Sequence, residues 1–146
     1  MLFRSTGTVS AKGGVRYPGK RVLVVEDNPI NSTVIRELLE VRLGVKVVEA
    51  PGGQEALDIC RTELFDLVLM DVQMPGMDGL ECTRRMRESA RQKDVPILAL
   101  SANVTPEDIN ACLAAGMDGH LGKPLILDQF LPVLHALWSP EEARDR

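Results

Sequence analysis

Residues 67–79 read LVLMDVQMPGMDG, and this stretch decides the fold of the chain. Its first four residues are apolar with no polar alternation, which indicates a strand buried on both faces, as in a parallel sheet covered by helices. The strand is followed by a carboxylate, Asp71, and then by a loop that contains Pro75, Gly76 and Gly79. Taken alone, Asp71 could be a helix cap, a turn residue, a metal ligand or a nucleophile.

Short apolar runs alternate with helical patterns along most of the chain. The predicted strands span residues 21–25, 45–48, 67–70, 95–100 and 119–123. The predicted helices span residues 29–42, 53–64, 79–91, 106–115 and 128–138. Thr105 followed by Pro106 is typical of a helix start, and Gly116 of a helix stop. This alternation predicts an α/β fold: a doubly wound, five-stranded parallel sheet of the flavodoxin-like (βα)5 type.

The composition of the strands predicts their order in the sheet. The two most apolar runs, 21–25 and 67–70, are expected near the centre, and the run 45–48, which carries Lys46, is expected at an edge. These positions favour the strand order 2-1-3-4-5, one of the two common doubly wound orders. The crossover connections are expected to be right-handed.

Composition indicates one globular domain of ordinary size. The chain has 146 residues, 45% of them hydrophobic and 26% charged, and its net charge of −4 gives no general reason to expect direct nucleic-acid binding. We expect a flexible linker at 1–19, a domain at 20–139 and a charged tail at 140–146. No apolar run is long enough to span a membrane and no secretory signal is recognisable, so a cytoplasmic location is expected. The cysteines have no metal-binding spacing and are expected to be buried free thiols: Cys60, Cys82 and Cys112.

Polar side chains gather at the carboxyl ends of the predicted strands. The first strand ends in Glu26 and Asp27, the third in Asp71, the fourth in Ser101 and the fifth in Lys123. Ligands bind at this edge of a doubly wound sheet, near the point where the strand order switches. Because the first and third strands are neighbours in the expected order, their three carboxylates should lie close together.

Three carboxylates at close range repel one another, and a hard divalent cation removes that repulsion. Mg²⁺ takes oxygen ligands and is usually held by one or two carboxylates together with phosphate oxygens. Zinc is disfavoured because no cysteine or histidine lies at ligand spacing nearby. The carboxylates of Glu26, Asp27 and Asp71 therefore predict a Mg²⁺ site.

A lysine and a hydroxyl at the same edge point to phosphoryl transfer. A carboxylate that attacks a phosphoryl group becomes an acyl phosphate, and positive charge and hydrogen-bond donors must stabilise the phosphoryl oxygens. Lys123, Ser101 and Mg²⁺ could supply them. Each residue also has a simpler interpretation: Asp27 could start a helix, Asp71 could close a turn, Ser101 could cap a helix, and Lys123 could be a solvated loop residue. The functional interpretation depends on their joint placement at one edge.

Four stretches of the sequence resemble the receiver domains of two-component phosphorelay signalling. The matching stretches are VLVVEDNPIN (22–31), LVLMDVQMPGMDG (67–79), PILALSAN (96–103) and AGMDGHLGKP (115–124). The resemblance implies Mg²⁺-dependent transfer of a phosphoryl group from phosphohistidine to the receiver. The donor is a histidine kinase or a histidine phosphotransfer domain. The receiver is then a phosphoacceptor that assists its own phosphorylation and dephosphorylation, and not a turnover enzyme.

The resemblance also implies roles for the residues that face the phosphate. Asp71 matches the phosphoacceptor, Lys123 the phosphate-binding lysine, and Ser101 the switch hydroxyl that moves toward the phosphate. Phosphorylation is then expected to repack the face made by the fourth helix, fifth strand and fifth helix. His120 falls at a switch position that is most often Tyr or Phe in the family, so its coupling to Ser101 differs from the usual pattern.

The metal ligands follow from the same resemblance. Asp27 matches the main acidic Mg²⁺ ligand, and Glu26 lies beside it and acts through water. Asp71 contributes its carboxylate, and Gln73 matches the position whose backbone carbonyl completes the protein ligands. A cis peptide bond between Lys123 and Pro124 is implied as well.

The motifs also narrow the type of receiver. EDNPIN, ALSAN and AGMDGHLGKP are most similar to receivers of hybrid sensor histidine kinases, so we expect the receiver of such a kinase, whose parent protein can be membrane-anchored; a stand-alone response regulator is the alternative. A phosphatase of the haloacid dehalogenase type is disfavoured, because Gln73 stands where that chemistry normally needs a second acid. A receiver-like interaction module that never carries phosphate is disfavoured, because the acids and the lysine are all present.

Overall fold

The computed structural model describes residues 8–9, 15–102 and 105–138. A parallel sheet forms the middle layer of this part of the chain, with the strand order β4-β3-β5-β6-β7. Its strands, in chain order, are β3 (Arg21–Val25), β4 (Lys46–Ala50), β5 (Leu67–Asp71), β6 (Ile97–Ser101) and β7 (Gly119–Gly122). Counted along the chain, this order is 2-1-3-4-5, so the predicted fold class and strand order are confirmed.

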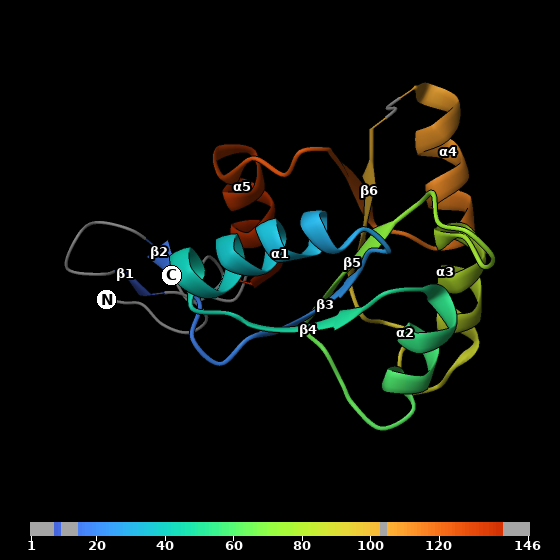
Figure 1. Ribbon diagram of the computed structural model, residues 1–146, viewed down its shortest axis with the longest axis horizontal. Helices are drawn as coiled ribbons and strands as arrows, with labels where there is room; N and C mark the ends of the chain where they lie inside the picture. Colours follow the sequence, from blue (N-terminus) through green and yellow to red (C-terminus); the bar gives the residue numbers. More distant parts are fainter. Residues whose placement is uncertain (1–7, 10–14, 103–104, 139–146) are drawn as a thin grey trace.

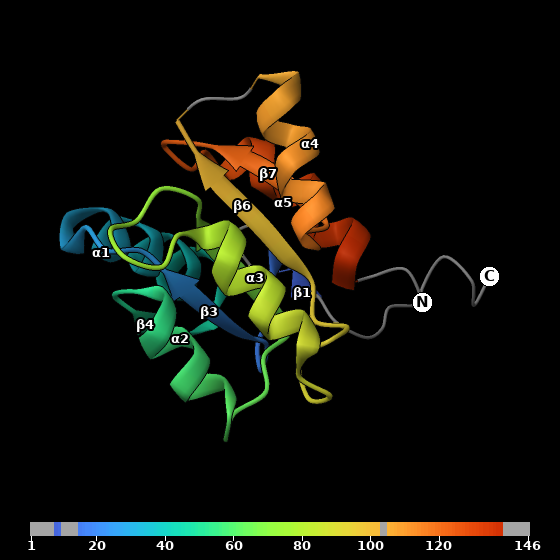
Figure 2. The same cartoon turned by 90° about the vertical axis from the view of Figure 1, so that its right-hand side faces the viewer.

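Helices cover both faces of the sheet (Figure 1). They are α1 (Pro29–Glu37), α2 (Gly53–Cys60), α3 (Gly79–Glu88), α4 (Pro106–Ala115) and α5 (Leu127–Trp138). Helices α1 and α5 pack on one face, and α2, α3 and α4 cover the other, where Figure 2 shows α3 in front of the sheet. Successive side chains of each strand point to opposite faces of the sheet, so the structure has two hydrophobic cores, one on each face.

The central strands are mostly apolar because both of their faces are buried. Strand β5 has no exposed residue from Leu67 to Asp71, and it lies between β3 and β6. Strand β4 lies at an edge, as its lysine predicted. Asp71 belongs to β5 as its last residue and pairs in register with Leu100 of β6, so the strand carries the acid directly to the edge of the sheet.

The helix starts follow the sequence signals. Thr105 caps α4 in a capping box with Asp108, and Gly116 ends that helix with a left-handed φ of 112°. Asn28 caps α1, because its side chain accepts the backbone N–H groups of Ile30 and Asn31. The interpretation of Asp27 as a helix cap is therefore wrong, since its neighbour performs that role.

The second and third helices are shorter in the structure than the sequence predicted. Helix α2 ends at Cys60 and not at residue 64, and α3 ends at Glu88 and not at residue 91. Ser89 ends α3 with an extended backbone, and the buried amide of Gln92 then donates to the carbonyl oxygens of Cys60, at 3.1 Å, and Glu63, at 2.8 Å, near the end of α2. The cysteines Cys60, Cys82 and Cys112 are buried free thiols, as predicted.

Residues before the sheet also contact its core. A short antiparallel pair, β1 (Thr8–Val9) and β2 (Val15–Arg16), precedes β3. Tyr17 is 1% exposed and packs edge-on against Trp138 of α5, with ring centroids 5.0 Å apart. Arg16 donates to the carbonyl oxygen of Val41 in η1 (Leu38–Arg42), the π-helical turn that continues α1. Sequence reasoning assigned residues 16 and 17 to a linker; the predicted tail at 140–146 lies outside the described residues.

Candidate functional site

The carboxyl ends of β3 and β5 bring three acids together. Glu26 and Asp27 follow β3, and Asp71 ends β5, which pairs with β3 in parallel register. One carboxylate oxygen from each of the three residues lies within 4.8 Å of the others. Glu26 and Asp71 are 3% and 2% exposed, whereas Asp27 is exposed at the mouth of the cluster. The predicted carboxylate cluster is therefore present and opens to solvent on the side of Asp27.

Lys123 supplies the positive charge of this cluster. It follows β7, and its ammonium nitrogen Nζ lies 3.1 Å from Asp71 Oδ1 and 3.2 Å from Glu26 Oε1. Its backbone N–H donates to the carbonyl oxygen of Ser101 at 3.0 Å, which ties the ends of β6 and β7 together. The peptide bond to Pro124 is cis, as the resemblance implied.

The surroundings of Asp71 oppose its ionisation. Burial is the main cause and raises the pKa of Asp71 to about 6, and the negative charge of Glu26 acts in the same direction. The hydrogen bonds from Lys123 and from the backbone of Gln73 lower the pKa but do not outweigh burial. Burial by itself lowers the pKa of Lys123. The hydrogen bonds of Lys123 to Asp71 and Glu26 together outweigh burial, so the pKa of Lys123 is raised. The lysine is therefore a cation at neutral pH, between two buried carboxyl groups.

Backbone N–H groups hold two of the carboxylates in place. The N–H of Gln73 donates to Asp71 Oδ1 at 3.1 Å, and the N–H of Asn28 donates to Glu26 Oε2 at 3.2 Å. Both bonds join a carboxylate to the N–H two residues later, as in an Asx-turn. The sequence analysis considered only the carbonyl of Gln73 and missed both donors, which the spacing of an Asx-turn could have indicated. The turn interpretation of Asp71 is thus correct in part: the same carboxylate closes a turn and faces Lys123.

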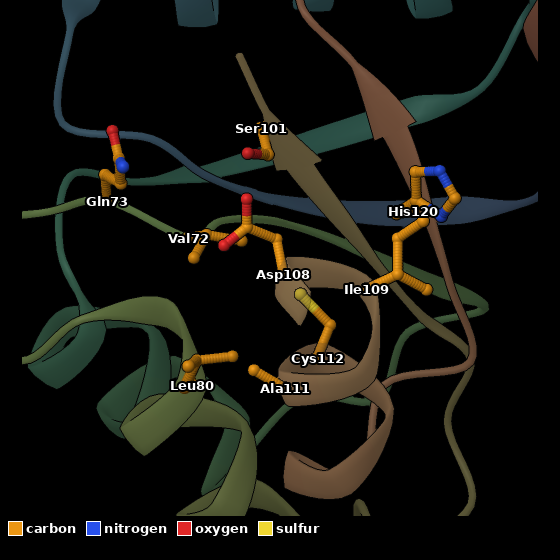
Figure 3. A pocket seen from close by; sticks show the side chains of 9 residues that line it. All are labelled: Val72, Gln73, Leu80, Ser101, Asp108, Ile109, Ala111, Cys112 and His120. Carbon is orange, nitrogen blue, oxygen red and sulfur yellow. The ribbon is translucent and has the colours of Figure 1, made fainter. Parts of the chain in front are cut away.

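Ser101 and His120 line a neighbouring pocket, shown in Figure 3. The pocket is a cavity of about 80 Å³ beside the carboxylate cluster, and Val72 and Gln73 form the wall nearest to Asp71. Ser101 ends β6 and is half-buried, and α4 is capped by Thr105, so the interpretation of Ser101 as a helix cap is wrong. The pocket also contains residues that the sequence analysis did not select, among them Asp108 and Cys112 of α4.

The donor set of the cluster fits Mg²⁺. The cluster consists of carboxylate oxygens alone, the ligands that hard divalent cations prefer. A cation would also relieve the repulsion among three acids that share one lysine. Asp27 and Asp71 offer carboxylate ligands. Gln73, whose backbone carbonyl the sequence analysis selected as a ligand, lies two residues after Asp71 on the loop that follows β5.

A doubly wound sheet with three acids and a lysine at its switch point defines the class of phosphoacceptor receivers in two-component signalling. The comparison of sequences agrees, since the family model of the response regulator receiver domain matches residues 22–135. The chain belongs to this family. A receiver domain is generally not an enzyme of the turnover kind.

The relatives include both sensor kinases and single-domain regulators. Sensor protein GacS of Pseudomonas syringae pv. syringae is 44% identical over 117 residues, which cover 78% of this chain and 13% of that protein. The polar-differentiation response regulator DivK of Brucella ovis is 31% identical over 115 residues, covering 79% of this chain and 93% of DivK. The chain thus spans only a small part of the sensor kinase, but most of the regulator.

A solved structure supports both the fold and the metal. The receiver domain of sensor histidine kinase PA1611 from Pseudomonas aeruginosa PAO1 is 37% identical and matches with a TM-score of 0.75, covering 82% of this chain and 97% of that domain. That crystal structure has a magnesium ion coordinated in its active-site cleft. In the described part of the present chain, no helix is both long enough and apolar enough to cross a membrane.

Proposed function

We propose that Asp71 is the phosphoacceptor of this receiver and takes its phosphoryl group from the phosphohistidine of a histidine kinase or a histidine phosphotransfer domain. One oxygen of the Asp71 carboxylate forms the new P–O bond while the P–N bond to the donor imidazole breaks. The bonding electrons go to the imidazole nitrogen, which then takes up a proton. The observation that carries this proposal is the buried Asp71 carboxylate, with Lys123 Nζ at 3.1 Å inside a cluster of three acids.

Lys123 neutralises charge in this reaction. Its ammonium group contacts both buried carboxylates before phosphorylation, so it can stabilise the negative charge that develops on the phosphoryl oxygens without a large movement. Ser101, at the adjoining end of β6, is the switch hydroxyl that moves toward the phosphate. His120 lines the same pocket as Ser101, which supports its place at the switch position. Phosphorylation then repacks the face made by α4, β7 and α5.

The metal site of this proposal uses residues of the carboxylate cluster. Asp27 and Asp71 hold Mg²⁺ through their carboxylates and Gln73 through its backbone carbonyl, and Glu26 acts through water. Bound Mg²⁺ supplies positive charge that neutralises phosphoryl oxygens during transfer. The exposure of Asp27 leaves the cluster open to the donor on that side, while Glu26 is buried and contacts Lys123.

The chain is the receiver part of a larger protein, a hybrid sensor histidine kinase. The 44% identity to GacS supports this origin, and the cytoplasmic location of the domain follows from phosphotransfer from a kinase. A stand-alone response regulator is the second candidate, because the matched region covers 93% of DivK.

Phosphotransfer from a radiolabelled histidine phosphotransfer domain tests the proposal. We expect label to move to the wild-type chain only in the presence of Mg²⁺, and to remain on the donor with Asp71→Asn. Transfer that is equally fast to Asp71→Asn would contradict the assignment of Asp71. Asp94→Asn is a matched control, because Asp94 is exposed and lies away from the cluster.

A further inference from the structure

The first residue of α3 touches the backbone of the phosphoacceptor strand. Gly79 is buried, and its N–H donates to the carbonyl oxygen of Val72 at 3.0 Å. A Cβ atom on Gly79 would lie 2.3 Å from the carbonyl oxygen of Asp71 and 2.9 Å from the Cα atom of Val72. Both neighbours are backbone atoms, so neither can rotate away as the end of a flexible side chain could.

The segment that Gly79 touches carries the reactive groups. Asp71 bears the carboxylate, and two residues later the N–H of Gln73 donates to Asp71 Oδ1 at 3.1 Å. Asp78 fixes the start of α3 on the other side, since its side chain accepts the N–H of Glu81 at 2.9 Å. The first turn of α3 therefore rests directly on the turn that orients the Asp71 carboxylate.

We propose that Gly79 is a positioning residue of the phosphoacceptor site: the absence of a side chain lets α3 close onto the Asp71–Val72 backbone and fixes the turn between Asp71 and Gln73. The inference rests on the proposed function of Asp71. Gly79 acts through the backbone of its neighbours and does not touch the phosphoryl group.

Backbone conformation does not explain a glycine at this position. Gly79 lies in helix α3 and does not have the positive φ that distinguishes Gly76 and Gly116. Helix propensity does not favour glycine over alanine either. The difference between glycine and alanine here is therefore the clash that an added Cβ atom would make with the carbonyl oxygen of Asp71. To relieve that clash, α3 or the Asp71–Gln73 segment would have to move by roughly 1 Å. A displacement of that size can reduce a reaction rate by about a hundredfold.

The test compares Gly79→Ala with Gly122→Ala in the full chain. Gly122 adjoins Lys123, but a Cβ atom there would meet nothing within 4 Å, so this variant controls for adding a methyl group near the site. For folded protein, confirmed by circular dichroism at low temperature, we measure Mg²⁺ affinity, the rate of phosphorylation by acetyl phosphate at saturating Mg²⁺, and the amide chemical shift of Gln73.

We expect phosphorylation of Gly79→Ala to be about tenfold to a hundredfold slower, with weaker Mg²⁺ binding and a shifted Gln73 amide, and Gly122→Ala to behave as wild type. A normal rate and affinity in folded Gly79→Ala would overturn the inference. If Gly79→Ala does not fold, Asp78→Ala tests the same idea by loosening the start of α3; several-fold slower phosphorylation supports it and an unchanged rate overturns it. A wild-type chain that takes no phosphate would instead refute the proposed function.

Discussion

Replacement of Asp71 by asparagine should stabilise the Mg²⁺-free domain, because it removes a buried negative charge and keeps the shape of the side chain. The pKa of Asp71 is about 6, against an ordinary value of 3.8. At about 1.36 kcal/mol for each tenfold change in acidity, that difference corresponds to roughly 3 kcal/mol of destabilisation at neutral pH. Lys123 loses one of its two carboxylate partners in the variant, so we expect a smaller net gain, about 1–2 kcal/mol.

The pH dependence of this gain has a definite sign. The folded-state pKa of Asp71 lies above its unfolded value, so the folded state binds a proton first as the pH falls. The destabilisation by the Asp71 charge is fully present above pH 6 and decreases between pH 6 and the unfolded pKa of 3.8. The advantage of Asp71→Asn over wild type should therefore be largest above pH 6 and shrink toward pH 4.

Urea unfolding followed by circular dichroism, with EDTA present, measures both effects. We compare wild type, Asp71→Asn and the exposed-site control Asp94→Asn from about pH 7.5 to about pH 4.5, and expect the control to stay within about 0.5 kcal/mol of wild type. Mg²⁺ should then stabilise wild type more than Asp71→Asn, because a ligand that binds only the folded state shifts the equilibrium toward it. An Asp71→Asn variant that is less stable than wild type near neutral pH, or a gain that does not change with pH, would refute the reasoning.

Three further predictions concern single side chains. Lys123→Ala should fold but accept phosphate from acetyl phosphate at least about tenfold more slowly, because the cation at the phosphoryl oxygens is lost; an unchanged rate in a phosphorylation time course contradicts its role. Asp27→Ala should weaken Mg²⁺ binding measured by titration, whereas Asp94→Ala should not, and equal affinities would exclude Asp27 as a ligand. Tyr17→Ala should lower the free energy of unfolding by about 3 kcal/mol or more, because it empties a fully buried aromatic site against Trp138; a loss below about 1 kcal/mol in urea unfolding would show that residue 17 is not part of the core.

The sequence predicts the sheet and its acidic edge because both depend on local patterns. The apolar runs of β3 and β5 require burial on both faces, and a doubly wound topology then brings Glu26, Asp27 and Asp71 to one edge without further information. Lys123 is placed in the same way, since β7 ends immediately before it.

The remaining features depend on contacts between segments that are distant in the sequence. Tyr17 is a single aromatic residue in a stretch without periodicity, and only its contact with Trp138, at the other end of the fold, shows that it belongs to the core. Gln92 joins the segment after α3 to the end of α2 by hydrogen bonds that span about thirty residues, and neither helix pattern contains that information. The contact of Gly79 with Asp71 is set by how α3 packs on the end of β5, which a helix-start signal does not specify.

Covalent phosphorylation of Asp71 is the central claim, and intact-mass spectrometry tests it most directly. The chain is incubated with acetyl phosphate, with Mg²⁺ or with EDTA, beside Asp71→Asn under the same conditions. We predict an adduct of about 80 Da, the mass of one phosphoryl group, on wild type in the presence of Mg²⁺ only, and none on Asp71→Asn. No adduct on wild type, or the same adduct on Asp71→Asn, would contradict the account.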